Sequence, residues 1–247
     1  MKSNILRPYD FIDNTINIMI IEDEPFQAEL ITEILEPVQL FSLYTVTTNK
    51  EAVSLFRSGK RFHVCILDLG ISDIDNDEFY ILRNYTNHCS VIVRTGSDSP
   101  KKGATCIQLG AKTVIEKGTM FDTCKFYQIV SRNAILNIVN FRYNESSGDT
   151  LSLATKILFE KNPDSVTQWA DYMRITDRQL RNLWRTGSGF GAKQILSLYH
   201  LYKDAFKYYR INMFGDLNER EQFKSFSDKS SRSYFENNRE ILTFLFS

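Results

Sequence analysis

Five short apolar stretches alternate with helix-like segments along the first 141 residues, and this order constrains the fold more than any other feature of the chain. The strand-like stretches are rich in branched and aromatic residues and cover 16–23, 41–47, 63–69, 90–96 and 112–118. Segments with helical spacing follow them, at 24–37, 49–59, 77–87, 99–110 and 121–141. Repeated β–α units place their strands in one parallel sheet with helices on both faces. The sequence therefore predicts an α/β fold with a five-stranded, doubly wound parallel sheet.

Two of the predicted helices carry signals at their ends. Pro25 stands where a first helical turn tolerates proline, and Asn49 and Gly59 are the residue types of an N-cap and of a helix end. Helical spacing places four apolar residues of the first helix on one side, and we expect them to face the core. They are Phe26, Leu30, Ile34 and Leu35.

Polar side chains end four of the five predicted strands. These residues are Glu22, Asp23, Asp68, Thr95, Glu116 and Lys117. An aspartate alone at such a position most often starts a turn. However, adjacent parallel strands end on one edge about 4.8 Å apart, so that these groups can converge. Carboxylates with water positions suit Mg²⁺, and a lysine with a hydroxyl suits a phosphoryl group. The set favours Asp68 as a nucleophile towards phosphorus.

Residues 16 to about 137 resemble the receiver domain of two-component response regulators, which has a flavodoxin-like fold. The residues that carry the resemblance are Glu22 and Asp23 after the first strand, Asp68 after the third, Thr95 after the fourth and Lys117 after the fifth. The spacing of the loop "DLGISDIDNDEF", which begins at Asp68, is also similar to that of the family. The resemblance implies that Asp68 accepts a phosphoryl group from a sensor histidine kinase or a phosphotransfer protein. It also implies that Lys117 and Thr95 bind oxygens of that group.

The resemblance further implies a Mg²⁺ cofactor in the same pocket. Asp23 and Asp68 would bind the ion directly, together with the backbone carbonyl of Gly70. Glu22 would act through a metal-bound water.

Four positions depart from the pattern of the family. Ser72 stands where proline is frequent and Asn76 where glycine is frequent, but asparagine tolerates left-handed backbone angles, so the turn can still form. Gly118 follows Lys117 where the family usually has proline. We expect a trans peptide bond there, because a cis bond without proline costs about 2.5–4 kcal/mol. Val114 occupies the position of the aromatic switch residue, so the usual ring rotation is absent.

Charge is unevenly distributed, although the formal net charge of the chain is zero. Residues 1–150 hold 15 basic and 19 acidic residues, whereas residues 151–247 hold 15 and 11. This asymmetry indicates two parts with different tasks. Four separated cysteines and three histidines without metal-ligand spacing argue against disulfides and a zinc site. Because no apolar run approaches the roughly 20 residues of a membrane helix and no secretory signal is visible, we expect a cytoplasmic protein without membrane contact.

A polar stretch at 143–150 predicts a linker between two domains. The first is the receiver domain at 16–142, which a tail at 1–15 precedes. The second, at 151–247, has helical spacing without strand-like alternation, and we expect it to be all-α.

Two amphipathic segments at 165–173 and 176–187 predict a helix-turn-helix in this second domain. A capping box from Thr176 to Gln179 starts the second helix. Four aromatic residues are expected in the core: Trp169, Trp184, Tyr199 and Tyr202. The other face of this second helix carries arginine, glutamine and asparagine. Arginine contacts guanine edges and phosphates, and glutamine or asparagine contacts adenine, so this face can bind DNA. The candidate DNA-binding residues are Arg178, Gln179, Arg181, Asn182 and Arg185.

Residues 175–206 resemble the first helix-turn-helix and the long linking helix of the AraC/XylS-type DNA-binding domain. Gly189 matches the glycine that precedes the linking helix, whereas Ala192 and His200 stand where proline and arginine are frequent. The second helix-turn-helix of that family would lie at 216–244, where the match is poor. This segment is either divergent or used for contact with another protein.

These features predict a phosphorylation-controlled transcription regulator whose partners include DNA and a second copy of the chain as a homodimer. The alternative is a receiver whose helical domain docks on a protein and does not bind DNA, which the modest charge of residues 151–247 and the poor match at 216–244 favour. An enzyme such as a phosphatase is disfavoured, because no further general base or substrate pocket accompanies the acids.

Overall fold

The computed structural model of the chain describes residues 16–96, 100–117, 122–140, 148–216 and 219. These residues form two compact units. The first is built on residues up to 137 and the second on residues 138–208, while the last described residues, from Tyr209, group with the first.

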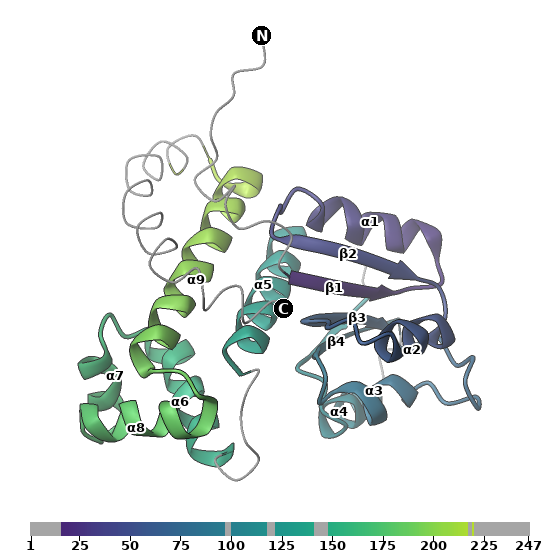
Figure 1. The fold of residues 1–247 in the computed structure, drawn as a ribbon. Helices are drawn as coiled ribbons and strands as arrows, with labels where there is room; N and C mark the ends of the chain where they lie inside the picture. The colour runs from purple at the N-terminus through teal and green to yellow at the C-terminus, as the bar shows by residue number, and fades with distance from the viewer. Residues whose placement is uncertain (1–15, 97–99, 118–121, 141–147, 217–218, 220–247) are drawn as a thin grey trace. The chain divides into compact units, whose positions relative to one another are not determined.

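A five-stranded parallel sheet forms the centre of the first unit (Figure 1). Its strands are β1 (Ile16–Ile21), β2 (Phe41–Val46), β3 (Val64–Asp68), β4 (Ser90–Thr95) and β5 (Thr113–Glu116). Hydrogen bonds join them in the order β2-β1-β3-β4-β5. All residues of β3 and β4 are buried, which explains why these strands are continuous apolar runs rather than alternating ones. The predicted five-stranded parallel sheet is confirmed.

Helices connect the strands and cover the sheet. They are α1 (Pro25–Leu35), α2 (Asn49–Arg57), α3 (Tyr80–Tyr85) and α4 (Pro100–Gln108), and α5 (Thr123–Asn140) follows β5. One apolar cluster joins α2, α3 and α4 to a single face of the sheet, to which Met19, Cys65 and Val93 contribute. Helix α1 lies on the other side of the sheet in Figure 1. The predicted arrangement with helices on both faces is thus confirmed for these helices.

The buried side of α1 differs from the predicted one. Its buried residues are Ala28, Ile31, Ile34 and Leu35, whereas Phe26 is 69% exposed and Leu30 is only half-buried. Two residues turn an α-helix by about 200°, so Phe26 and Leu30 both point away from the side that Ala28 buries. The expectation that Phe26 faces the core was wrong, while Pro25 does begin the helix.

The start of α2 also corrects a prediction. Its N-cap is Thr48, whose hydroxyl accepts a hydrogen bond from the Glu51 amide, and not Asn49. Asn49 is instead fully buried, and its side chain donates to the carbonyl of Ile71 at 2.8 Å. Gly59, with a φ of 81°, follows the end of this helix as expected.

The loop after β3 contains two left-handed residues. Asp75 and Asn76 both have a φ of 54°, so the tolerance expected of Asn76 is used. The carboxylate of Asp73 accepts hydrogen bonds from the amides of Asn49 and Lys50, which ties this loop to the start of α2. The peptide bond between Lys117 and Gly118 lies outside the described residues.

The second unit is helical throughout its described residues. It contains α6 (Gly148–Lys161), α7 (Val166–Met173), α8 (Asp177–Ser188) and most of α9 (Ala192–Phe214). Residues 148–150 belong to α6, which corrects the predicted linker at its end; residues 141–147 lie outside the described part. The rings of Trp169 and Trp184 pack at 5.4 Å between centroids, and the Trp169 indole donates to the carbonyl of Ala154. Both rings are fully buried, as expected.

The capping box at the start of α8 is present. The Thr176 hydroxyl accepts from the Gln179 amide, and the Gln179 side chain accepts from the Thr176 amide at 2.8 Å. Gly189, with a φ of 79°, ends the helix. Helices α7 and α8 are both present, and three residues join them. That the pair forms a helix-turn-helix motif remains a prediction. The tail at 1–15 and nearly all of 216–244 lie outside the described residues.

Candidate functional site

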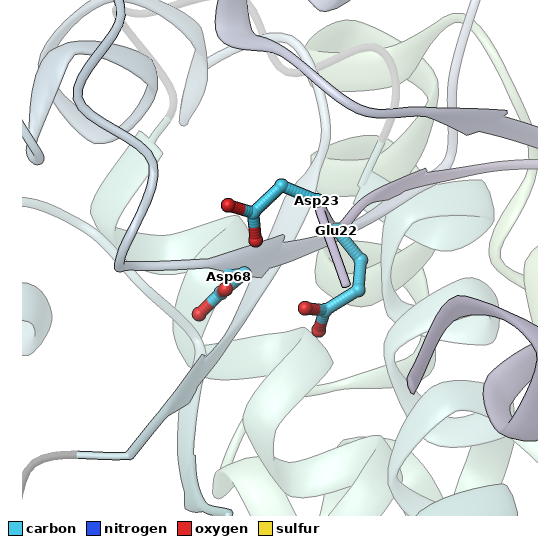
Figure 2. A group of neighbouring side chains, drawn as sticks. All are labelled: Glu22, Asp23 and Asp68. Carbon is cyan, nitrogen blue, oxygen red and sulfur yellow. The ribbon is translucent and has the colours of Figure 1, made fainter. Parts of the chain in front are cut away.

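Three carboxylates meet at the ends of β1 and β3. One carboxylate oxygen from each of Glu22, Asp23 and Asp68 lies within 4.8 Å of the others. Figure 2 shows these three side chains as neighbours. The two strands are direct neighbours with Ile21 paired to Leu67, so the residues that follow them share one edge. Glu22 and Asp68 are 1% and 7% exposed, whereas Asp23 is exposed to solvent. The predicted convergence of these acids is therefore present in the structure.

Lys117 bridges two of the acids. Its Nζ lies 2.9 Å from Oε1 of Glu22 and 2.9 Å from Oδ2 of Asp68. The backbone positions it, because the Lys117 amide donates to the carbonyl of Thr95 at 2.8 Å, which continues the pairing of β4 with β5. An ammonium group at this place can hold an oxygen of any group that is attached to Asp68.

Thr95 and Asp68 line a common cleft of about 330 Å³. The lining residues are Asp68, Leu69, Gly70, Glu78, Thr95, Gly96, Lys102 and Lys117. Inside it, the Gly70 amide donates to Oδ1 of Asp68 at 3.2 Å, which orients the carboxylate. Metal binding by the Gly70 carbonyl remains a prediction. The cleft is large enough for a phosphoryl group.

Arg94 is a member of this site that our sequence interpretation missed. It is 2% exposed and lies on β4 beside Asp68 of β3. Its Nη1 is 3.3 Å from Oε2 of Glu22, and its Nη2 donates to Oε1 of Gln27 on α1 at 2.9 Å. The signal was the arginine inside the apolar run "SVIVRT", because a charged residue in a buried strand requires a charged partner.

Burial dominates the electrostatics of the Glu22–Arg94 pair. It raises the pKa of Glu22 above its ordinary value, and the charge of Asp68 adds to this, while Lys117 and Arg94 oppose it. Burial likewise lowers the pKa of Arg94, against the attraction of Glu22. With all groups ionised, three carboxylates face two cations, which leaves one negative charge.

The donor set fits Mg²⁺. All three candidate side chains offer carboxylate oxygens, which this ion prefers, and the exposed Asp23 leaves space for water ligands. Asp23 and Asp68 would hold the ion. Both oxygens of Glu22, by contrast, already face cations.

The candidate DNA-binding residues lie together on α8. Arg178, Gln179, Arg181, Asn182 and Arg185 are all exposed. Four of them line a cleft of about 420 Å³ between α8 and the start of α9, to which Lys193 adds a fourth cation. Gln179 is absent from the lining of this cleft, and its side-chain oxygen is used in the capping box. Arg181 also lies 3.7 Å from Asp177.

None of the described helices combines the length and the apolar character that crossing a membrane requires.

Comparisons with known proteins concern the first unit. The signal receiver domain of a putative Luxo repressor protein from Vibrio parahaemolyticus is 22% identical, with a TM-score of 0.44, and the match covers 49% of this chain and 91% of that one. The signal receiver domain of a DNA binding response regulator protein from Colwellia psychrerythraea 34H is 25% identical, with a TM-score of 0.41, over 47% and 98% of the two chains. No curated protein matches the chain.

A family model gives the assignment. The model of the response regulator receiver domain matches residues 18–125, which include the three acids, Arg94, Thr95 and Lys117. Together with the parallel sheet and the acidic pocket at its edge, this match identifies residues 18–125 as the receiver domain of a two-component response regulator, a domain of phosphorylation-controlled signalling.

Proposed function

We propose that Asp68 is the phosphoacceptor of this receiver domain. The observation that carries the proposal is the position of the Lys117 ammonium group, which contacts the Asp68 carboxylate at 2.9 Å in a cleft that Thr95 also lines. A buried carboxylate with a fixed cation beside it can form a bond to phosphorus while the cation holds a phosphoryl oxygen.

The transfer is a displacement at phosphorus. An oxygen of Asp68 forms the new bond to phosphorus, and the bond from phosphorus to the nitrogen of a donor histidine breaks, with the electron pair leaving on the imidazole. Lys117 pairs with one phosphoryl oxygen, and the Thr95 hydroxyl would donate to another. Mg²⁺, when bound to Asp23 and Asp68, would neutralise charge on the transferred group. The product is a signalling state of this protein and not the turnover of an external substrate.

Asp68 can be tested with acetyl phosphate, Mg²⁺ and mass measurement of the intact chain. The wild type should gain one phosphoryl group. Asp68→Asn should gain none, because the amide is not a nucleophile. Asp75→Asn is a matched control, since Asp75 lies exposed in the same loop and asparagine accepts its left-handed φ of 54°. Equal phosphorylation of wild type and Asp68→Asn would refute the assignment.

We further propose that the second unit binds DNA through the exposed face of α8. The support is the cleft in which Arg178, Arg181, Arg185 and Lys193 gather, because four cations around one concave surface suit a phosphate backbone. Phosphorylation of Asp68 would then regulate transcription by changing the availability of this surface or the pairing of two chains. Location in the cytoplasm, where DNA and phosphodonors meet, is part of this proposal.

The DNA proposal predicts a salt-dependent affinity for a random-sequence duplex, which is expected to fall as salt rises. The change Arg181→Ala or Arg185→Ala should weaken binding and reduce the slope of log affinity against log salt by about one for each DNA phosphate that is no longer neutralised. Lys156→Ala is a suitable control, because Lys156 is 68% exposed on α6 and lies outside the cleft. Binding that is insensitive to both arginine changes would favour the alternative, a helical module that docks on a protein.

A further inference from the structure

The buried Arg94 contacts the acidic pocket from one face of the sheet, and the cleft lined by Asp68 and Thr95 lies on the other face. Side chains alternate along a strand, so the odd-numbered Thr95 shares the side of Val93, which packs towards α2, α3 and α4. Arg94 therefore points to the other face, where it meets Gln27 of α1. From there its guanidinium reaches Glu22 at 3.3 Å.

Glu22 is held from two sides. Oε2 faces Arg94, and Oε1 faces Lys117 at 2.9 Å, so each oxygen of the carboxylate has a cationic neighbour. The hydrogen bond from Arg94 to Gln27 orients the guanidinium in turn. If Glu22 were to bind a metal ion directly, it would have to turn an oxygen away from one of these cations.

The charge of the pocket supports a consequence for metal binding. Glu22, Asp23 and Asp68 carry three negative charges, and Arg94 and Lys117 carry two positive ones. Without Arg94 the pocket would hold two net negative charges instead of one, and a divalent cation would bind a more negative site. Because Arg94 and Glu22 are both buried, water screens this difference little.

Building on the proposed function of this pocket, we propose that Arg94 is a positioning residue that holds Glu22 out of the metal coordination and lowers the affinity of the receiver domain for Mg²⁺. Glu22 then acts as an anchor for Arg94 and Lys117, and Asp23 and Asp68 are left as the protein ligands. This assignment differs from the water-mediated metal role that the family resemblance implied for Glu22.

The test is the dissociation constant of Mg²⁺, measured on the full chain by calorimetry. Arg94→Met should bind Mg²⁺ about tenfold or more tightly, because the methionine fills much of the space without the charge. A purely structural defect would weaken binding, so the direction of the change separates the two explanations. Arg94→Lys should stay near the wild type, since it keeps the positive charge.

In Arg94→Met, the buried carboxylate of Glu22 loses one of its two cationic partners, and a double variant controls for this loss. Arg94→Met combined with Glu22→Gln has the same net charge in the pocket as the wild type. Its Mg²⁺ affinity should therefore return towards the wild-type value, while the buried ion pair is absent. Arg83→Met serves as control, because Arg83 pairs with Asp77 on the surface, and should leave the affinity unchanged.

The outcomes separate this inference from the proposed function. If the wild type binds no Mg²⁺ and gains no phosphoryl group, the function of the pocket is wrong. If the wild type binds Mg²⁺ and is phosphorylated, but Arg94→Met binds the ion equally or more weakly, only the role of Arg94 is refuted. Tighter binding by Arg94→Met that the double variant reverses would support it.

Discussion

His63 makes the stability of the first unit sensitive to acid. The residue directly precedes β3, is 2% exposed, and is joined to β1 by two hydrogen bonds. Its backbone amide donates to the carbonyl of Asn17 at 2.9 Å, and its ring Nδ1 accepts from the Asn17 amide at 3.1 Å. Burial lowers the pKa of His63 to about 3, and the positive charge of Arg61 adds to this effect. The folded protein therefore keeps the ring neutral at every pH near physiological conditions.

The size of the effect follows from the two pKa values. In the unfolded chain the pKa of His63 is 6.5, so its folded value is depressed. Stability from the neutral ring is thus complete above pH 6.5 and is lost as the pH falls towards 3. Between pH 7 and pH 5 the unfolded state takes up a proton that the folded state refuses, and this lowers the free energy of unfolding by about 2 kcal/mol.

Hydrogen exchange of the amides in β1 and β3, followed by mass spectrometry, measures this loss. His63→Asn keeps an acceptor for the Asn17 amide but cannot bind the proton, so its opening free energy should fall by about 2 kcal/mol less than that of the wild type between pH 7 and pH 5. His88→Asn, at an exposed histidine of the same unit, controls for the loss of an imidazole. Parallel losses in the wild type and His63→Asn would refute the reasoning.

Three further predictions test the packing within each unit. Cys124 is partly exposed and the other three cysteines are buried, so a thiol reagent should label one site rapidly in the native protein and Cys124→Ser should abolish that phase. Trp169→Phe should lower the free energy of unfolding by about 1–2 kcal/mol, because the buried carbonyl of Ala154 on α6 loses the hydrogen bond from the indole; thermal unfolding measures this. Gly110→Ala should destabilise more than Gly59→Ala, which costs about 1 kcal/mol for its positive φ. A methyl at Gly110 would also lie 3.0 Å from Thr86, whereas the one at Gly59 meets open space, and comparing the two denaturation midpoints decides this.

The sequence predicted the receiver pocket because parallel strands bring their ends to one edge. Glu22, Asp68 and Lys117 lie far apart in the chain, but each directly follows or ends a strand, so the sheet order alone brings them together. Periodicity was likewise enough for α8, whose capping box marks its first residue and whose buried side contains Trp184.

Features that depend on contacts with residues far away in the chain could not be predicted from the sequence. Thr48 and Asn49 are adjacent and are both good N-cap residues, and only the buried carbonyl of Ile71 decides that Asn49 is used elsewhere. For Arg94, the apolar run predicted a buried strand, but the acid that neutralises it stands 72 residues earlier. Phe26 fits a helical stripe, yet the sheet covers the stripe that begins at Ala28.

The packed indole pair gives the chain a built-in optical reporter for one of its halves. Trp169 and Trp184 are the only two tryptophans of the sequence, and both belong to the unit that lacks the acidic pocket. Intrinsic emission excited at the red edge of protein absorption therefore observes the helical unit alone, without labels. A change of that emission on modification of Asp68 would be a direct readout of communication between the halves, because no fluorophore of this type lies in the half that is modified.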